Sequence, residues 1–308
     1  MRISAIIALV FAGLLTSCTE RVEIYYSANL NGNLLGCDCW GYPEAGLDKR
    51  AWYLNQNPLP EDALLLDAGN ILETGRDPVL TGYILKTYQE LGYQAVAVGT
   101  NELADGPGLL MERIKDGSFI SHNIISEPEG TPLTARPLIL EAETGVRVAV
   151  ISLADPDWFN PWLTRFNGAL SIKSPAAVLE EQQEMAAEEG AAAIVLLANG
   201  SEDWIRGLMA NQEVNNLRKT HDTITPVAAV ILAGEEKLIE EKLPGGIPLL
   251  SPGEEGNRLG ILSLKLHSSR KPGWKNEFIE FHYLGLGDET VADRGAEYAE
   301  YLNAKRSN

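Results

Sequence analysis

Short apolar runs alternate with amphipathic stretches along most of the chain. Several of the runs are continuous and rich in β-branched residues, which is typical of strands buried on both faces. The runs lie at Val22–Tyr26, Ala63–Leu66, Ala95–Val98, Phe119–Ile120, Val146–Leu153, Ile194–Leu197 and Ala228–Leu232. The stretches with helical spacing lie at Leu47–Asn55, Val79–Leu91, Pro107–Lys115, Pro175–Glu189, Asp203–Asn211 and Glu236–Lys242. This alternation predicts a layered α/β fold.

The pattern changes toward the end of the chain. Leu259–His267 and Asn276–Leu284 alternate apolar and polar residues, which predicts an antiparallel pair of strands, and Glu297–Ala304 predicts a short terminal helix. There is no internal repeat, low-complexity segment or linker. We therefore expect one domain over residues 22–304.

The first 18 residues have the pattern of an export signal. Arg2 is followed by an apolar run, Ala5–Leu15, that is too short for a membrane span. The segment Leu15-Thr16-Ser17-Cys18 resembles a bacterial lipobox, which implies lipid on Cys18 and a membrane as partner. The alternative is a plain signal peptide with Cys18 incidental. Because Thr19 is not Asp, we expect an exported lipoprotein on the periplasmic side of the outer membrane.

Composition narrows the class of partner. The chain has 308 residues, of which 45% are hydrophobic and 22% charged, which is ordinary for a globular protein. Its formal net charge is −18. Such a surface repels phosphate backbones, so we expect no nucleic-acid partner.

Polar loops follow several of the predicted strands, where α/β proteins usually carry their chemistry. Four of them are Ala28–Gly32, Asp67–Asn70, Gly99–Glu102 and Gly234–Lys237, and Ala45–Arg50 opens a predicted helix. The order and spacing of these segments resemble the calcineurin-like metallophosphoesterase domain in its 5′-nucleotidase branch. The resemblance covers Val22 to about Leu264 and implies a four-layer α/β/β/α sandwich. It also implies a two-metal site that binds phosphate and generates the attacking hydroxide.

The first three motifs of that family can be placed one at a time. Its Asn-Asp-x-His-Gly motif is matched by Ala28–Gly32, so the two ligand positions are Asn29 and Asn31. Its Gly-Gly-x-x-Arg motif is matched by Ala45–Arg50. Its Asp-x-Gly-Asp motif is matched by Asp67–Asn70, and the residue that would bridge both metals is Asn70.

The remaining motifs also lack their usual ligands. Gly-Asn-His-Glu is matched by Gly99–Glu102, where Thr100 replaces a ligand and Asn101 the catalytic histidine. A later histidine ligand is replaced by Asn199. Gly-His-x-His is matched by Gly234–Lys237, which puts Glu235 and Lys237 at the histidine positions.

Asparagine thus occupies five positions where the family has ligands or a catalytic residue. An amide oxygen can bind a hard cation but carries no charge, so two divalent ions would be held poorly. The four histidines follow none of the ligand motifs; they are His122, His221, His267 and His282. We expect a degenerate metal site, no metal cofactor and no working phosphatase. A single Mn²⁺ or Zn²⁺ held by Glu235 and amides stays open, with Glu102 as the other charged residue nearby, and the asparagines can equally cap turns.

Cys37 and Cys39 are one residue apart, close after the first loop. A disulfide between them closes a small, strained ring, and strain makes a disulfide easier to reduce. Asp38 raises the pKa of both thiols, which argues against a highly reactive thiolate. The segment resembles a cysteine-containing branch of exported nucleotidase-like proteins, some of them selenoproteins, and this implies thiol redox chemistry. A structural disulfide and a metal or partner site remain alternatives.

Three functional hypotheses follow. The first is a membrane-anchored, degenerate nucleotidase-like protein whose Cys37/Cys39 loop does redox or binding work, with a redox or protein partner. The second is a residual metal-dependent phosphoesterase with an asparagine-rich site. The third is a scaffold that presents loops to a partner. Too few residues follow Leu264 for the family's nucleoside-recognition domain, which counts against a nucleotide-specific enzyme.

Overall fold

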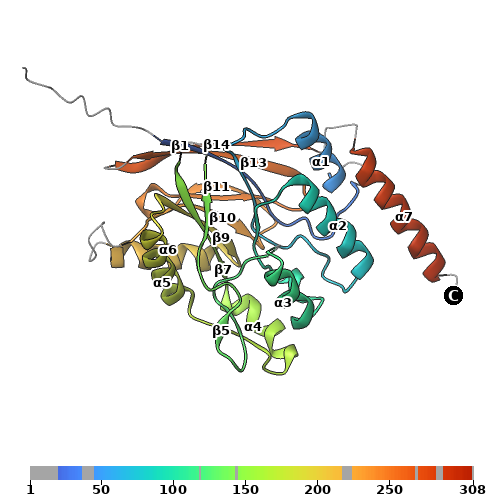
Figure 1. Ribbon diagram of the computed structural model, residues 1–308, viewed down its shortest axis with the longest axis horizontal. Coiled ribbons are helices and arrows are strands. Elements are labelled where there is room, and N and C mark those ends of the chain that lie inside the picture. Colours follow the sequence, from blue (N-terminus) through green and yellow to red (C-terminus); the bar gives the residue numbers. More distant parts are fainter. Residues whose placement is uncertain are drawn as a thin grey trace, which may run out of the picture.

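Two β-sheets pack face to face with helices on both outer sides (Figure 1). The computed structural model describes residues 20–36, 45–117, 119–142, 145–216, 224–267, 270–281 and 287–306. Cys18, Cys37, Cys39, His221 and His282 lie outside the described residues. Within the described part, no helix is long and apolar enough to cross a membrane.

The first sheet has five strands, of which the two C-terminal ones form its antiparallel edge. Its order is β14 (Arg270–Glu280), β13 (Arg258–His267), β1 (Glu20–Ser27), β2 (Leu64–Asp67) and β3 (Ala95–Val96). β1, β2 and β3 run parallel, while β13 pairs antiparallel with both β1 and β14. The carboxyl ends of β1, β2 and β3 therefore meet at one edge of this sheet.

The second sheet has six strands with a parallel centre. Its order is β11 (Leu238–Lys242), β12 (Pro248–Pro252), β10 (Val227–Ala233), β9 (Ala193–Asn199), β7 (Arg147–Ala154) and β6 (Leu138–Glu141). The edge strands β11 and β6 are antiparallel to their neighbours. A small third sheet has the order β5 (Thr131–Pro132), β4 (Ile124–Ser126) and β8 (Leu170–Ile172).

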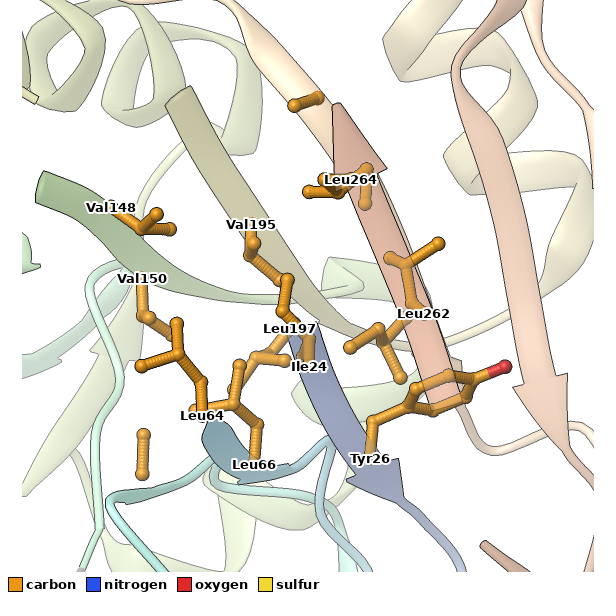
Figure 2. Packing of buried hydrophobic residues seen from close by; sticks show 14 of the residues in the cluster. Ile24, Tyr26, Leu64, Leu66, Val148, Val150, Val195, Leu197, Leu262 and Leu264 are labelled. Carbon is orange, nitrogen blue, oxygen red and sulfur yellow. The ribbon is translucent and has the colours of Figure 1, made fainter. Parts of the chain in front are cut away.

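The main core fills the space between the two large sheets. Figure 2 shows Ile24 and Tyr26 of β1 facing the same cluster as Val195 and Leu197 of β9. Alternate residues of β9 pack instead against the helices on the outer side, so every residue of β9 and of β10 is buried. This burial on both faces explains the continuous apolar runs in the sequence.

Helices cover the outer face of each sheet, which completes four layers. On one side lie α5 (Pro175–Glu188) and α6 (Glu202–Asn216), which pack on β7, β9 and β10 (Figure 1). On the other side lie α1 (Leu47–Gln56), α2 (Pro78–Leu91) and α7 (Glu289–Arg306), with α3 (Pro107–Lys115) and α4 (Pro156–Leu163) below them in Figure 1. Short 3-10 turns span Asn101–Leu103, Thr164–Phe166 and Pro244–Gly246. The predicted α/β/β/α sandwich is confirmed.

Several predicted elements differ from the structure. The helix predicted over Glu236–Lys242 is wrong, because this segment contains the edge strand β11, which pairs with β12. Its Glu and Lys residues favour a helix locally, but pairing with a neighbouring strand overrides that preference. Phe119–Ile120 forms only an isolated bridge between Ile120 and Ala97. The last strand begins earlier than predicted, at Arg270, and the last helix also begins earlier, at Glu289.

His122 is a core histidine that ties β7 to the loop before β4. Its Nδ1 accepts a hydrogen bond from Ser152 N (3.0 Å), and its Nε2 lies 3.0 Å from Arg136 O, which makes Nε2 the protonated nitrogen of a neutral ring. Burial lowers the pKa of His122 to about 4. It does not line the pocket described below, and we assign it no part in that site.

We predict that His122 makes the protein less stable in mild acid. The unfolded chain takes up a proton near pH 6.5 and the folded chain only near pH 4, so this stability is complete above pH 6.5 and declines as the pH falls toward 4. Between pH 7 and pH 4.5 the decline is about 2 to 3 kcal/mol. Urea unfolding should show that the stability gap between the wild type and His122→Gln shrinks over this interval. A gap that does not change with pH would contradict the assignment.

Candidate functional site

Backbone hydrogen bonds hold the loops after β1 and β2 side by side. Asn29 N donates to Gly69 O (2.9 Å), Asn31 N to Asn70 O (2.9 Å) and Gly32 N to Ile71 O (3.1 Å). The two strands are parallel neighbours, so their loops leave the sheet at the same edge. Three of the predicted site residues, Asn29, Asn31 and Asn70, are thereby brought together.

These three asparagines share an unusual backbone conformation. Their φ angles are 51° for Asn29, 54° for Asn31 and 58° for Asn70, all in the left-handed region. Among residues with a side chain, asparagine and aspartate tolerate this region best, because their short polar groups bond locally. Asparagine can therefore keep the shape of these loops while placing no charge in them.

Asn29 connects the first sheet to loops of the second sheet. Its Nδ2 donates to Glu235 O (2.9 Å) and Gly253 O (3.0 Å), and its Oδ1 accepts from Gly234 N (2.8 Å). Two carbonyls and one N–H fix the orientation of the amide. Its oxygen is therefore already used, and the side chain acts as a bridge between the loops after β1, β10 and β12.

The other amides form a chain of hydrogen bonds across the same edge. Asn70 Nδ2 donates to Asn29 Oδ1 (3.3 Å), and Asn70 Oδ1 accepts from Asn101 N (3.2 Å). Asn101 Nδ2 donates to Asn31 Oδ1 (3.1 Å), and Thr100 Oγ1 lies 3.4 Å from Asn70 Oδ1. The structure therefore brings Asn29, Asn31, Asn70, Thr100 and Asn101 into one network, as their places at the strand ends predict.

Glu102 belongs to the scaffold beneath this network. Its Oε1 accepts from Ile71 N (2.8 Å) and Leu72 N (3.1 Å), and its Oε2 accepts from Asn70 N (2.9 Å) and Gly99 N (2.6 Å). Burial raises the pKa of the Glu102 carboxyl, and the backbone bonds oppose that rise. With four donors already bound, the carboxylate holds two loops in place and is no free ligand.

Asn199 lies at the end of β9, behind Asn70. Its side chain is fully buried, and neither Nδ2 nor Oδ1 has a hydrogen-bond partner among the described residues. A Cβ atom on Gly99 would overlap both Asn199 Nδ2 and Asn70 Oδ1. Glycine at position 99 therefore lets the two amides approach, and Asn199 carries an unmet donor and acceptor at the back of the network.

Glu235 and Lys237 point to a different place from the one predicted. Glu235 Oε1 accepts from Glu202 N (3.0 Å) at the start of α6, and Lys237 Nζ pairs with Glu202 Oε2 (2.5 Å). The partnership with Glu202 raises the pKa of Lys237. The backbone of Glu235 meets the asparagine network through Asn29, while the side chains of Glu235 and Lys237 do not line the pocket described next.

A pocket of about 450 Å³ opens at this edge of the sheets. Its lining residues are Asn29, Asn31, Asn70, Glu73, Thr74, Thr100, Asn101, Trp158, Gly234 and Glu236. Sequence reasoning missed Glu73, Thr74, Trp158 and Glu236. The sequence does hold a signal for Trp158, because this residue closely follows the predicted strand Val146–Leu153. In the structure it lies in the first turn of α4, and its ring packs so close to Gly234 that a Cβ there would overlap it.

The donor set does not fit a pair of divalent ions. Among the residues that the structure describes, no group of three or more His, Cys, Asp or Glu side chains is placed to hold a metal. The oxygens of Asn29, Asn31 and Asn70 already accept hydrogen bonds. Neutral oxygens engaged in this way are weak ligands for hard cations.

A second buried network lies deeper in the first sheet. Asp67 Oδ2 accepts from Ser27 Oγ (2.5 Å) and Tyr88 Oη (2.9 Å), and its Oδ1 accepts from Gly69 N (2.8 Å). Arg50 Nη1 lies 3.8 Å from Asp67 Oδ2 and donates to Tyr88 Oη (2.9 Å). Both Arg50 and Asp67 are fully buried, so this pair anchors α1 and α2 to β2 behind the pocket.

Known structures share the fold of this chain at low sequence identity. A 5′-nucleotidase precursor from Thermus thermophilus matches with TM-score 0.73 and 18% identity over 92% of this chain. The calcineurin-like phosphoesterase YfkN from Bacillus subtilis matches with TM-score 0.69 and 19% identity, over 92% of this chain and 98% of that one. The Thermus thermophilus sulfate thiohydrolase SoxB matches with TM-score 0.73 and 16% identity over 92% of this chain.

The chain has the fold of metallophosphoesterase structures. It spans 59% of the Thermus nucleotidase precursor and 61% of SoxB. No protein-family model and no curated protein matches the sequence. At these identities the likeness establishes the fold, and function has to be argued from the site.

We predict that Glu102→Gln destabilises the protein strongly. The new amide group would place N–H donors against backbone N–H donors and leave two of them unsatisfied in the interior, at a cost of about 2 to 4 kcal/mol. Chemical unfolding monitored by fluorescence measures this loss. Glu112→Gln on the exposed face of α3 is the control, with an expected change within about 0.5 kcal/mol. Equal stability of the two variants would contradict the scaffold role.

Proposed function

We propose that this protein is an exported, lipid-anchored, metallophosphoesterase-like binding protein that does not hydrolyse phosphoesters. The observation that carries the proposal is the amide network, in which Asn70 donates to Asn29, Asn101 donates to Asn31, and backbone N–H groups donate to Asn29 and Asn70. Such a network is stable by itself. It supplies neither the charge that holds a metal nor a base that would activate water.

The charge of the pocket supports the same proposal. Glu73 and Glu236 line it, and none of its described lining residues is Lys, Arg or His. A phosphate monoester brings further negative charge at neutral pH and would meet repulsion here. Lys237 is the cationic residue among the predicted site positions, and its ammonium group pairs with Glu202.

One observation favours a second candidate, a residual metal-dependent phosphoesterase. Asn199 keeps a buried oxygen without a partner among the described residues next to Asn70, and an amide oxygen can bind Mn²⁺ or Zn²⁺. The two candidates differ in a measurable way. Only the second requires a bound metal and release of phosphate.

We predict that purified protein incubated with Mn²⁺ and Zn²⁺ and then desalted holds less than about 0.1 metal equivalent per chain. It should release no phosphate from p-nitrophenyl phosphate. Asn31→Asp/Asn70→Asp should gain binding, because each new carboxylate keeps the oxygen that accepts from Asn101 and adds a charge to the pocket. Mn²⁺ should raise the melting temperature of this variant and leave the wild type unchanged.

Gln56→Glu/Gln89→Glu is the matched control, since it adds the same charge at exposed positions of α1 and α2. It should show no response to Mn²⁺. Near-stoichiometric metal in the wild type together with phosphate release would overturn the proposal and establish the second candidate. Bound metal in the wild type without phosphate release would show that the pocket is a metal site, while the proposal that the protein does not hydrolyse phosphoesters would stand.

The loop with Cys37 and Cys39 is the second part of the proposal. The residues on both sides of it are fixed: Gly36 N donates to Asp48 Oδ1 (3.1 Å), and Ala45 N donates to Asn257 Oδ1 (2.8 Å). Gly46 is so close to Gly36 that a Cβ on it would overlap the Gly36 backbone nitrogen. Gly36 and Gly46 therefore lie side by side, close to the start of α1. This suits a loop that presents its thiols to a redox or protein partner while Cys18 carries the lipid.

We predict that Cys37 and Cys39 form a disulfide that a glutathione buffer poised at about −200 mV reduces, because a ring this small is strained. Intact-mass measurement after alkylation counts the reduced thiols at each potential. Cys37→Ser should leave no reducible bond. A bond that survives to about −300 mV would instead indicate a structural disulfide. Two free thiols in air-oxidised protein would favour the metal or partner alternative.

A further inference from the structure

We propose that the pocket at the strand ends binds an uncharged, polyhydroxylated small molecule of monosaccharide size. This inference rests on the proposed function, because it assigns a ligand class to a site that does no hydrolysis. The volume of about 450 Å³ lies within the range of small-molecule sites, about 300 to 1,000 Å³. The chemistry of the lining selects the ligand class.

The floor of the pocket consists of neutral groups that both donate and accept hydrogen bonds. Within the network, Asn31 uses its Oδ1 and Asn101 uses its Nδ2. Asn31 Nδ2 and Asn101 Oδ1 have no hydrogen-bond partner among the described residues. Thr100 and Thr74 add hydroxyl groups to the lining. Sugar hydroxyls also donate and accept at once, so they match such a surface without bringing a charge to be neutralised.

One wall of the pocket includes an aromatic side chain, Trp158. Trp158 is half-buried, stands in the first turn of α4 and lies against the backbone of Gly234. The face of an indole ring is electron-rich and attracts the weakly positive C–H groups on one side of a sugar ring. An aromatic wall beside amide donors and acceptors can therefore bind the apolar and the polar side of one such ring.

The charges of the pocket argue against two other ligand classes. Glu73 and Glu236 are exposed and lie at the rim, where they can accept hydrogen bonds from hydroxyl groups. Since no cationic side chain of the described part of the chain lines the pocket, a phosphate group would be repelled. An organic cation would need a desolvated carboxylate, whereas both of these carboxylates are screened by water.

Asn199 is a buried amide close to the floor of the pocket, and the described residues supply none of its side-chain hydrogen bonds. Its amide is fully buried, has no partner among the described residues and lies against Asn70, which lines the pocket. Buried polar atoms nearly always find a partner. A hydroxyl group, or a water held by one, that displaces Asn70 slightly would give the Asn199 amide its donor and its acceptor.

The test is calorimetric titration of the purified full-length protein with D-glucose, D-galactose, D-mannose and N-acetyl-D-glucosamine. Glucose 6-phosphate and choline serve as the charged comparators. We expect at least one neutral sugar to bind with a dissociation constant below about 10 mM, and its affinity to exceed that of either charged comparator about tenfold. Trp158→Ala should weaken this binding about tenfold, while Trp158→Phe should retain most of it.

Trp162→Ala is the matched control, because Trp162 lies one turn further along α4 and does not line the pocket. It should bind sugar as the wild type does, and the melting temperatures of all variants confirm that they fold. Tighter binding of choline or glucose 6-phosphate, no binding of any sugar, or an unchanged affinity in Trp158→Ala would each overturn the inference. The phosphatase assay on the same preparation separates the two proposals: no sugar binding without phosphate release refutes only the ligand class, whereas phosphate release refutes the proposed function.

Discussion

The buried carboxylate of Glu102 is the interaction on which the strand-end loops depend. It accepts four backbone N–H groups, three from the loop after β2 and one from the loop after β3. Without it these donors would be left unsatisfied in the interior, at a cost of about 1 to 3 kcal/mol each. The loop after β1 in turn pairs its backbone with the loop after β2, so the shape of the whole pocket floor rests on one ionised side chain.

This scaffold explains how the site keeps its shape with neutral side chains at its centre. Loop conformation is fixed by Glu102, by glycine at position 99 and by left-handed backbone at Asn29, Asn31 and Asn70. None of these features requires a metal. Asparagine meets the backbone requirement as well as aspartate does and adds a donor, so the amides bond to one another where carboxylates would repel one another.

Much of the fold could be predicted from the sequence, because burial on both faces leaves a direct signal. β9 and β10 are apolar at nearly every position, and their predicted positions are confirmed. The helix predicted over Glu236–Lys242 failed, since the edge strand β11 is decided by pairing with β12 and not by local preference. The structure brings Asn29, Asn31, Asn70, Thr100 and Asn101 together, because strand ends fix where such loops lie. The side chains of Glu235 and Lys237 turn instead toward Glu202 on another element, a partner that the local sequence does not reveal.

What the sequence could not show is which charges support the fold and which face the pocket. Glu102 and Glu235 look equivalent in the sequence, as acidic residues beside a ligand motif. In the structure Glu102 is consumed by backbone donors and Glu235 binds the first turn of α6. Arg50 likewise donates to Tyr88, which donates to Asp67, and the guanidinium lies 3.8 Å from the Asp67 carboxylate deep in the first sheet. Each of these buried or half-buried charges has a structural partner, while the pocket floor is lined by neutral amides and hydroxyls. A ligand therefore meets a neutral floor below an acidic rim of Glu73 and Glu236, and we expect its recognition to depend on hydrogen-bond pairing and on contact with Trp158.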